Sequence, residues 1–125
     1  MLINLVPDFL AVLASADRVS AYYRYVEQHQ ALLHAYWHNY VVDPEGPHFD
    51  DVIQGAMQAE YAALDAMLER VDVVTLARAA EMQCRELLAA DVDVDVVLMV
   101  GVGAANAGEL VVNGRGTAFV CLEHF

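Results

Sequence analysis

The apolar β pattern near the C-terminus constrains the fold of this chain most. An apolar strand is expected over residues 92–100, followed by a Gly- and Asn-rich turn region and a second apolar strand over residues 117–123. A two-stranded ribbon alone in water leaves one face and two edges uncovered. Helices from earlier in the chain can cover one face, but the chain ends where a further covering element is expected. We therefore expect another piece of protein to shield this ribbon.

The alternation within the first of these strands predicts how it is buried. Asp93 and Asp95 lie opposite the apolar side at first, and Val97 and Met99 then take their place. The strand should therefore begin half exposed and end buried on both faces.

Two features of the connection between these strands suggest turns. Residues 109–112 can form a short strand, and Asn113-Gly114 is a strong turn pair. The stretch 101–108 contains three glycines but no Lys, and no helix clearly follows it. We expect it to bend the backbone or to form the rim of a cleft rather than to bind a nucleotide.

Helical periodicity precedes the ribbon. A brief helix is expected near residues 8–13, and longer helices over about 18–40, 49–70 and 73–90. Asp17 and Asp72 are good caps for the first and the last of the long helices. The whole chain, residues 1–125, therefore reads as a single α+β domain, with three to four N-terminal helices over 1–90 and a β-hairpin or ribbon over 92–123.

The charge of the chain excludes some classes of partner. There are 18 acidic residues against 6 basic ones, which gives a formal net charge of −12. Such a surface repels phosphate groups, so we expect no nucleic-acid partner and no anionic membrane surface. The N-terminus lacks the basic region of a signal peptide, and no apolar run reaches the roughly 18 residues of a membrane span. We expect a cytoplasmic protein.

The two cysteines fit a structural role. Cys84 falls on the apolar side of its expected helix, and Cys121 lies within an expected strand. They form no CxxC pair, and two cysteines are too few for a disulfide framework, so we expect reduced core thiols.

Three residues suggest a metal site on the helix expected over 18–40. His34 and His38 are four residues apart, so both rings can face one point. Glu27 precedes His34 by seven residues and falls on the same flank of that helix. These three side chains would suit zinc with an open fourth position, and the alternative is that they are partly exposed residues flanking Trp37. The residue after His34 is Ala35, so the catalytic Glu of a zinc-protease helix is lacking.

Glu60 is the anomalous residue of the next helix. It falls within the apolar stripe, between Met57 and Leu64. A buried carboxylate is costly unless it is paired or protonated, so Glu60 could be an acid, base or metal ligand facing a cavity, or a structural partner of an Arg or a Tyr.

Three segments of the chain resemble a known bacterial family. They are the pair Tyr25-Val26-Glu27 and Trp37-His38-Asn39-Tyr40, the strand Val96-Val97-Leu98-Met99-Val100-Gly101, and the run from Asn113 to Glu123. Together they resemble the front half of predicted zinc-dependent proteases of zincin type. The resemblance implies a helical region, a β-ribbon, and then a helix carrying HExxH, whose two His bind zinc and whose Glu activates water. No HExxH occurs in this chain, so none of these ligands maps onto its residues.

The resemblance implies a non-catalytic part of a zinc metallopeptidase that is inactive on its own. Its metal site would lie in a C-terminal catalytic segment beyond Phe125, and the edge of the ribbon would pair with an extended peptide substrate. One alternative is a non-enzymatic domain that forms a homodimer through its ribbon. Another is a small metal-binding protein that uses Glu27, His34 and His38, with Glu60 as a further ligand.

Overall fold

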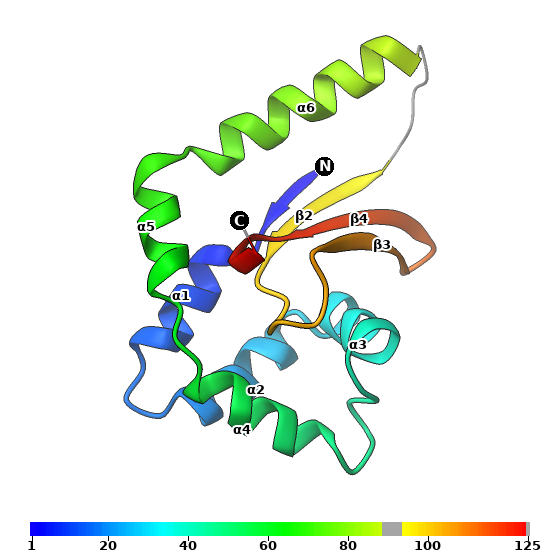
Figure 1. The fold of residues 1–125 in the computed structure, drawn as a ribbon. Coiled ribbons are helices and arrows are strands. Elements are labelled where there is room, and N and C mark those ends of the chain that lie inside the picture. The colour runs from blue at the N-terminus through cyan, green and yellow to red at the C-terminus, as the bar shows by residue number, and fades with distance from the viewer. Residues whose placement is uncertain (89–93, 125) are drawn as a thin grey trace.

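The computed structural model describes residues 1–88 and 94–124, except for the side chains of four residues near the end of the last helix: Cys84, Arg85, Leu87 and Leu88. Within the described residues, helices precede most of the strands, which confirms the predicted α+β class (Figure 1). The helices are α1 (Val6–Ala14), α2 (Arg18–Gln28), α3 (Gln30–Tyr40), α4 (Phe49–Gln58), α5 (Ala62–Arg70) and α6 (Val73–Leu88). The strands are β1 (Leu2–Asn4), β2 (Asp95–Met99), β3 (Ala107–Val112) and β4 (Arg115–Cys121), and a 3-10 turn, η1 (Leu122–His124), follows β4.

The sheet has the order β1-β2-β4-β3. β2 pairs in parallel with both β1 and β4, and the hairpin is formed by β3 and β4. The expectation that the two long strands form a hairpin with each other is therefore wrong. The connection between them contains β3, which takes the antiparallel position beside β4 and leaves β4 to meet β2 in parallel. The N-terminal strand β1, which the sequence pattern did not indicate, pairs with the other edge of β2.

The predicted turn and cap residues have the expected roles. Asn113 and Gly114 both adopt positive φ, 51° and 77°, as the two central residues of the tightest hairpins do. Asp17 accepts a hydrogen bond from Ser20 N at the start of α2, and Asp72 accepts one from Thr75 N at the start of α6.

Two helices that the periodicity predicts as continuous are each broken. The helix expected over 18–40 ends at Gln28 and restarts at Gln30, because His29 leaves the helical region with φ −116° and ψ 38°. The helix expected over 49–70 ends at Gln58, where Ala59 turns extended with ψ 157°, and restarts at Ala62. Neither break involves Pro or Gly, so the usual helix-breaking signals did not mark them.

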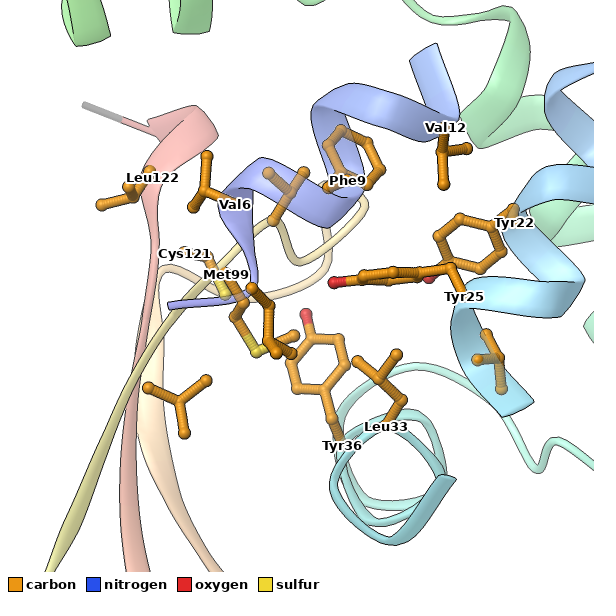
Figure 2. Close-up of a cluster of buried hydrophobic side chains, with 14 of the residues drawn as sticks. Val6, Phe9, Val12, Tyr22, Tyr25, Leu33, Tyr36, Met99, Cys121 and Leu122 are labelled. Carbon is orange, nitrogen blue, oxygen red and sulfur yellow. The ribbon is translucent and has the colours of Figure 1, made fainter. Parts of the chain in front are cut away.

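The core is aromatic and joins α1, α2 and α3 to the sheet (Figure 2). The Trp37 indole N–H donates to the Tyr22 hydroxyl at 3.0 Å, so the largest buried side chain keeps its one polar atom satisfied. On β4, the Phe119 ring packs edge-on against the rings of Tyr36 and Tyr40, at centroid distances of 5.2 and 4.8 Å. These contacts place α3 against the sheet face that carries Phe119.

The chain's own elements bury most of the apolar β segment. Val97, Leu98, Met99 and Val100 are all buried, and β2 changes from half exposed to buried along its length, as predicted. The expectation that another protein must cover this strand is therefore wrong, since helices and neighbouring strands already do so. Apolar exposure remains at the edge of the sheet, where Val111 on β3 is 72% exposed.

The last helix departs from its predicted burial. The helical periodicity places Leu76 on the same apolar stripe as Val73 and Ala77, but Leu76 is 61% exposed, whereas Val73, Val74 and Ala77 are half-buried against the core. Figure 1 shows α6 running beside β1, apart from the helices that pack around α2. The Cys84 side chain and residues 89–90 of the predicted helix lie outside what the structure describes.

Candidate functional site

A buried carboxylate at the end of β4 is the most unusual polar group in the described residues. Glu123 lies in η1, and its Oε1 accepts hydrogen bonds from Gly101 N at 2.7 Å and Gly103 N at 3.1 Å. His124 Nε2 lies 3.6 Å from the same oxygen. The other oxygen, Oε2, is buried and has no hydrogen-bond partner among the described residues. Such an atom is costly to leave unpaired, so it marks a place where a donor is expected.

The loop after β2 binds this carboxylate through its backbone amides. Val102 and Gly103 both adopt positive φ, 49° and 79°. A β-branched residue rarely adopts this conformation, so the backbone at Val102 is strained. The strain is consistent with a loop shaped to direct the amides of residues 101 and 103 at one anion, as in the concave amide nests that bind negative groups.

Side chains of α3 and β4 pack closely around Gly101 in this loop. A Cβ at this position would lie 2.4 Å from the Tyr36 hydroxyl oxygen and 2.5 Å from Cys121 Sγ. The same hydroxyl donates to the Gly101 carbonyl at 2.6 Å. Helix α3, strand β4 and the loop therefore meet at a point that only glycine can occupy.

A cavity of about 500 Å³ lies beside Glu123. Its walls come from the end of α4, the start of α5 and the loop after β2: Val52, Gly55, Ala56, Ala59, Glu60, Tyr61, Ala63, Leu64, Val102, Gly103 and Glu123. Most of these side chains are small or apolar. The charged ones among the described lining residues are two carboxylates, Glu60 and Glu123, and no Arg is among them. The cavity therefore combines apolar walls with negative charge.

Burial keeps the hydroxyl and thiol groups near Glu123 protonated. Loss of hydration raises the pKa of Tyr25 and of Tyr36 well above the usual value, and it raises the pKa of the Cys121 thiol to about 12. The negative charge of Glu123 adds to each of these shifts. At neutral pH Cys121 is thus a thiol and not a nucleophilic thiolate, which confirms its predicted place as a buried core residue and argues against cysteine catalysis here.

A second site lies at the free edge of the sheet. The Tyr40 hydroxyl donates to the Glu109 carbonyl at 2.8 Å and accepts from Glu109 N at 3.2 Å. Because Cys121 N donates to Asn106 O, the alternating antiparallel register directs the main-chain groups of residues 107, 109 and 111 away from β4. A groove of about 830 Å³ beside this edge is lined by Asn39, Tyr40, Glu109, Leu110, Val111, Gly116 and Thr117.

The structure separates the predicted metal residues. Glu27 is exposed on α2, whereas His34 and His38 lie on α3, half-buried and exposed respectively. The prediction that Glu27 shares one helical flank with the two histidines is wrong, because the break at His29 intervenes. Among the described side chains, no three His, Cys, Asp or Glu residues are grouped as metal ligands. Zinc binding by this chain therefore stays a prediction.

Glu60 does not lie in the core. It falls in the break between α4 and α5 and is exposed, so the predicted burial in an apolar stripe is wrong. It does line the cavity beside Glu123. Sequence analysis missed Glu123 itself, for which the available signal was an acidic residue directly after an apolar strand.

The chain matches no protein-family model, and neither a curated protein nor a solved structure matches it significantly. None of the helices in the described part of the chain is both long and apolar enough to cross a membrane.

Proposed function

We propose that this chain is the non-catalytic N-terminal part of a zincin-like metallopeptidase and that it binds an extended peptide along β3. The observation that carries the proposal is the free edge of β3, which follows a helical region in the order that the family resemblance implies. Peptide addition to an antiparallel edge uses main-chain hydrogen bonds for affinity and side-chain pockets for specificity.

The edge offers the groups that such a peptide needs. The register directs the main-chain N–H and C=O groups of Ala107, Glu109 and Val111 outward, and the groove beside them can receive side chains. Tyr40 holds both groups of Glu109, so an incoming peptide must displace its hydroxyl. Its ring stays packed on Phe119, which makes Tyr40 a partial cover of the edge.

The chain supplies no hydrolytic step in this proposal. It lacks HExxH, and the described side chains do not form a three-ligand metal group. Zinc and the activated water would belong to a separate catalytic segment. We therefore expect no zinc-dependent peptide hydrolysis by this chain alone, and turnover with added zinc would contradict the assignment.

The test is peptide binding measured by NMR chemical-shift changes, using a library of unstructured peptides on the wild-type chain and two variants. Tyr40→Phe keeps the ring contacts and frees the Glu109 main-chain groups, so it should tighten binding about twofold to tenfold. Val111→Pro removes an outward N–H while sparing the bonds to β4, so it should abolish binding. Binding that neither variant alters would refute an edge-strand site.

The same edge could instead pair with β3 of a second copy, in a two-fold dimer. Exposed Val111 would then be buried between the subunits. Light scattering across a concentration series distinguishes the cases: a dimer that Val111→Pro converts to monomer would favour self-pairing over peptide binding.

A further inference from the structure

We propose that the peptide that adds to β3 carries a Lys or Arg opposite Glu109 and an apolar residue opposite Val111. This inference rests on the peptide-binding edge proposed above, and it names the class of peptide that the edge selects. In an antiparallel arrangement the apolar residue comes two positions before the basic one. The motif is therefore an apolar residue, then any residue, then a basic residue.

The side chains of β3 alternate between two faces of the sheet. A Cβ at Gly108 would lie 2.6 Å from the Tyr40 hydroxyl oxygen, and Leu110 is buried, so these two positions face α3. Glu109 and Val111 therefore point to the opposite face, where both are exposed. In an added strand, the side chains opposite Glu109 and Val111 project from that same exposed face.

Glu109 fixes the register of the added strand. Its N–H and C=O both point outward, and they already meet a single atom, the Tyr40 hydroxyl oxygen, at 3.2 and 2.8 Å. In an antiparallel pair, such a residue exchanges both hydrogen bonds with the one residue directly opposite it. The peptide residue that displaces the Tyr40 hydroxyl therefore lies opposite Glu109, with the two Cβ atoms about 5 Å apart.

The charge at this position selects a basic residue. The Glu109 carboxylate is exposed and forms no ion pair within the described part of the chain. Arg115 of the same hairpin binds Asp95 through two hydrogen bonds of 3.0 Å, and the alternation along β4 places it on the face of α3. Of the described residues that line the groove, only Glu109 carries a charge. Opposite charges directly across a strand pair are stabilising and like charges are destabilising.

Val111 supplies the apolar half of the motif. It is 72% exposed beside the free edge, so an apolar side chain opposite it would remove both side chains from water. A second copy of β3 fits this surface less well than such a peptide. In the two-fold register that pairs all three outward residues, Glu109 would lie directly opposite Glu109 of the second copy, and the two carboxylates would repel each other.

The experiment is an NMR titration of the full chain with capped peptides that have Lys, Gln or Glu at the centre of Thr-Val-Thr-Lys-Thr-Thr-Thr. Salt at about 0.15 M screens charges more than about 8 Å apart, so the net charge of the chain contributes little. The Lys peptide should bind about twofold to fivefold more tightly than the Gln peptide, and the Glu peptide more weakly than either. The shift changes should fall at residues 107–111.

A peptide of the same composition tests the order of the motif. Thr-Thr-Thr-Lys-Thr-Val-Thr places its Val opposite Ala107 instead of Val111 when its Lys lies opposite Glu109. It should bind about twofold more weakly than the first Lys peptide. Equal binding of the two orders would overturn the antiparallel register on which the motif depends.

Variants of the chain locate the charge preference. Glu109→Gln should make the Lys and Gln peptides bind equally, and Glu109→Lys should make the Glu peptide bind more tightly than the Lys peptide. Glu69→Lys makes the same change of net charge at an exposed position on α5, and it should leave the preference for Lys unchanged.

The outcomes separate this inference from the proposed function. If the Lys, Gln and Glu peptides bind equally, or if Glu109→Lys and Glu69→Lys alter the preference alike, the basic motif is overturned while the edge-strand site stands. If no peptide shifts the signals of residues 107–111, the motif and the peptide-binding edge both fail.

Discussion

Gly101→Ala should destabilise the protein through crowding alone. The new Cβ would lie 2.4 Å from the Tyr36 hydroxyl oxygen and 2.5 Å from Cys121 Sγ, so the helix or the strand has to move by about 1 Å. Overpacking of this kind costs about 1–3 kcal/mol, and loss of the hydrogen bond from Tyr36 to the Gly101 carbonyl adds about 1 kcal/mol. We expect the free energy of unfolding to fall by about 2–4 kcal/mol, which lowers the melting temperature by roughly 10 °C.

Urea denaturation followed by circular dichroism measures this change, with Gly55→Ala as the control. A Cβ at Gly55 meets nothing within 4 Å, and the residue lies inside α4, so that variant should gain about 0.5–1 kcal/mol. In the double variant Gly101→Ala/Tyr36→Phe, one crowded atom is absent, so its loss should be smaller than the sum of the two single losses. A Gly101→Ala protein within 0.5 kcal/mol of the wild type, or additive losses, would refute the packing argument.

Two further predictions follow from the buried groups near Glu123. In a Cys84→Ser background, iodoacetamide should not alkylate Cys121 in the folded protein up to about pH 9, because burial raises the pKa of its thiol to about 12. Rapid labelling of the native protein would contradict this prediction, since it would show that the thiol is accessible. Burial also raises the pKa of Tyr25 and Tyr36 above the usual value of 10.0 in the folded state. The contribution of these two tyrosines to stability is thus complete below about pH 10 and is lost as the pH rises towards their folded-state pKa. Part of the phenolate absorbance at 295 nm should therefore appear only together with alkaline unfolding. A tyrosine titration that is complete before the protein unfolds would contradict this prediction.

Local signals in the sequence were sufficient where one residue decides the structure. The caps at Asp17 and Asp72 and the turn at Asn113-Gly114 follow from side-chain and backbone preferences that act within a few residues. The break at His29 has no such signal. There, packing of two short helices around the core outweighs helix continuity, and with the break the predicted alignment of Glu27 with His34 is lost.

The pairing partner of a strand is not a local property. Alternation predicted that β2 and β4 are strands, but it could not distinguish a hairpin from two parallel neighbours separated by β3. This difference decides the candidate site. In the parallel register Met99 lies beside Cys121, and two residues further along each chain Gly101 lies next to Glu123. A direct hairpin would have run the two strands in opposite directions and carried these two residues apart.

The loop that binds Glu123 allows a matched test of what the hydrogen bond from Gly103 contributes to stability. Gly103 and Gly114 have nearly the same φ, 79° and 77°, and a Cβ at either would meet nothing within 4 Å. Each Gly→Ala substitution should therefore cost the same 1–2 kcal/mol of backbone strain. Only Gly103 donates its N–H to Glu123, so only Gly103→Ala should also weaken that hydrogen bond, and the free energy of unfolding should fall by about 1 kcal/mol more than in Gly114→Ala. If Gly114→Ala, at the distant hairpin turn, lowered the free energy of unfolding in urea denaturation as much as Gly103→Ala does, backbone strain alone would explain both losses and the hydrogen bond to Glu123 would contribute nothing.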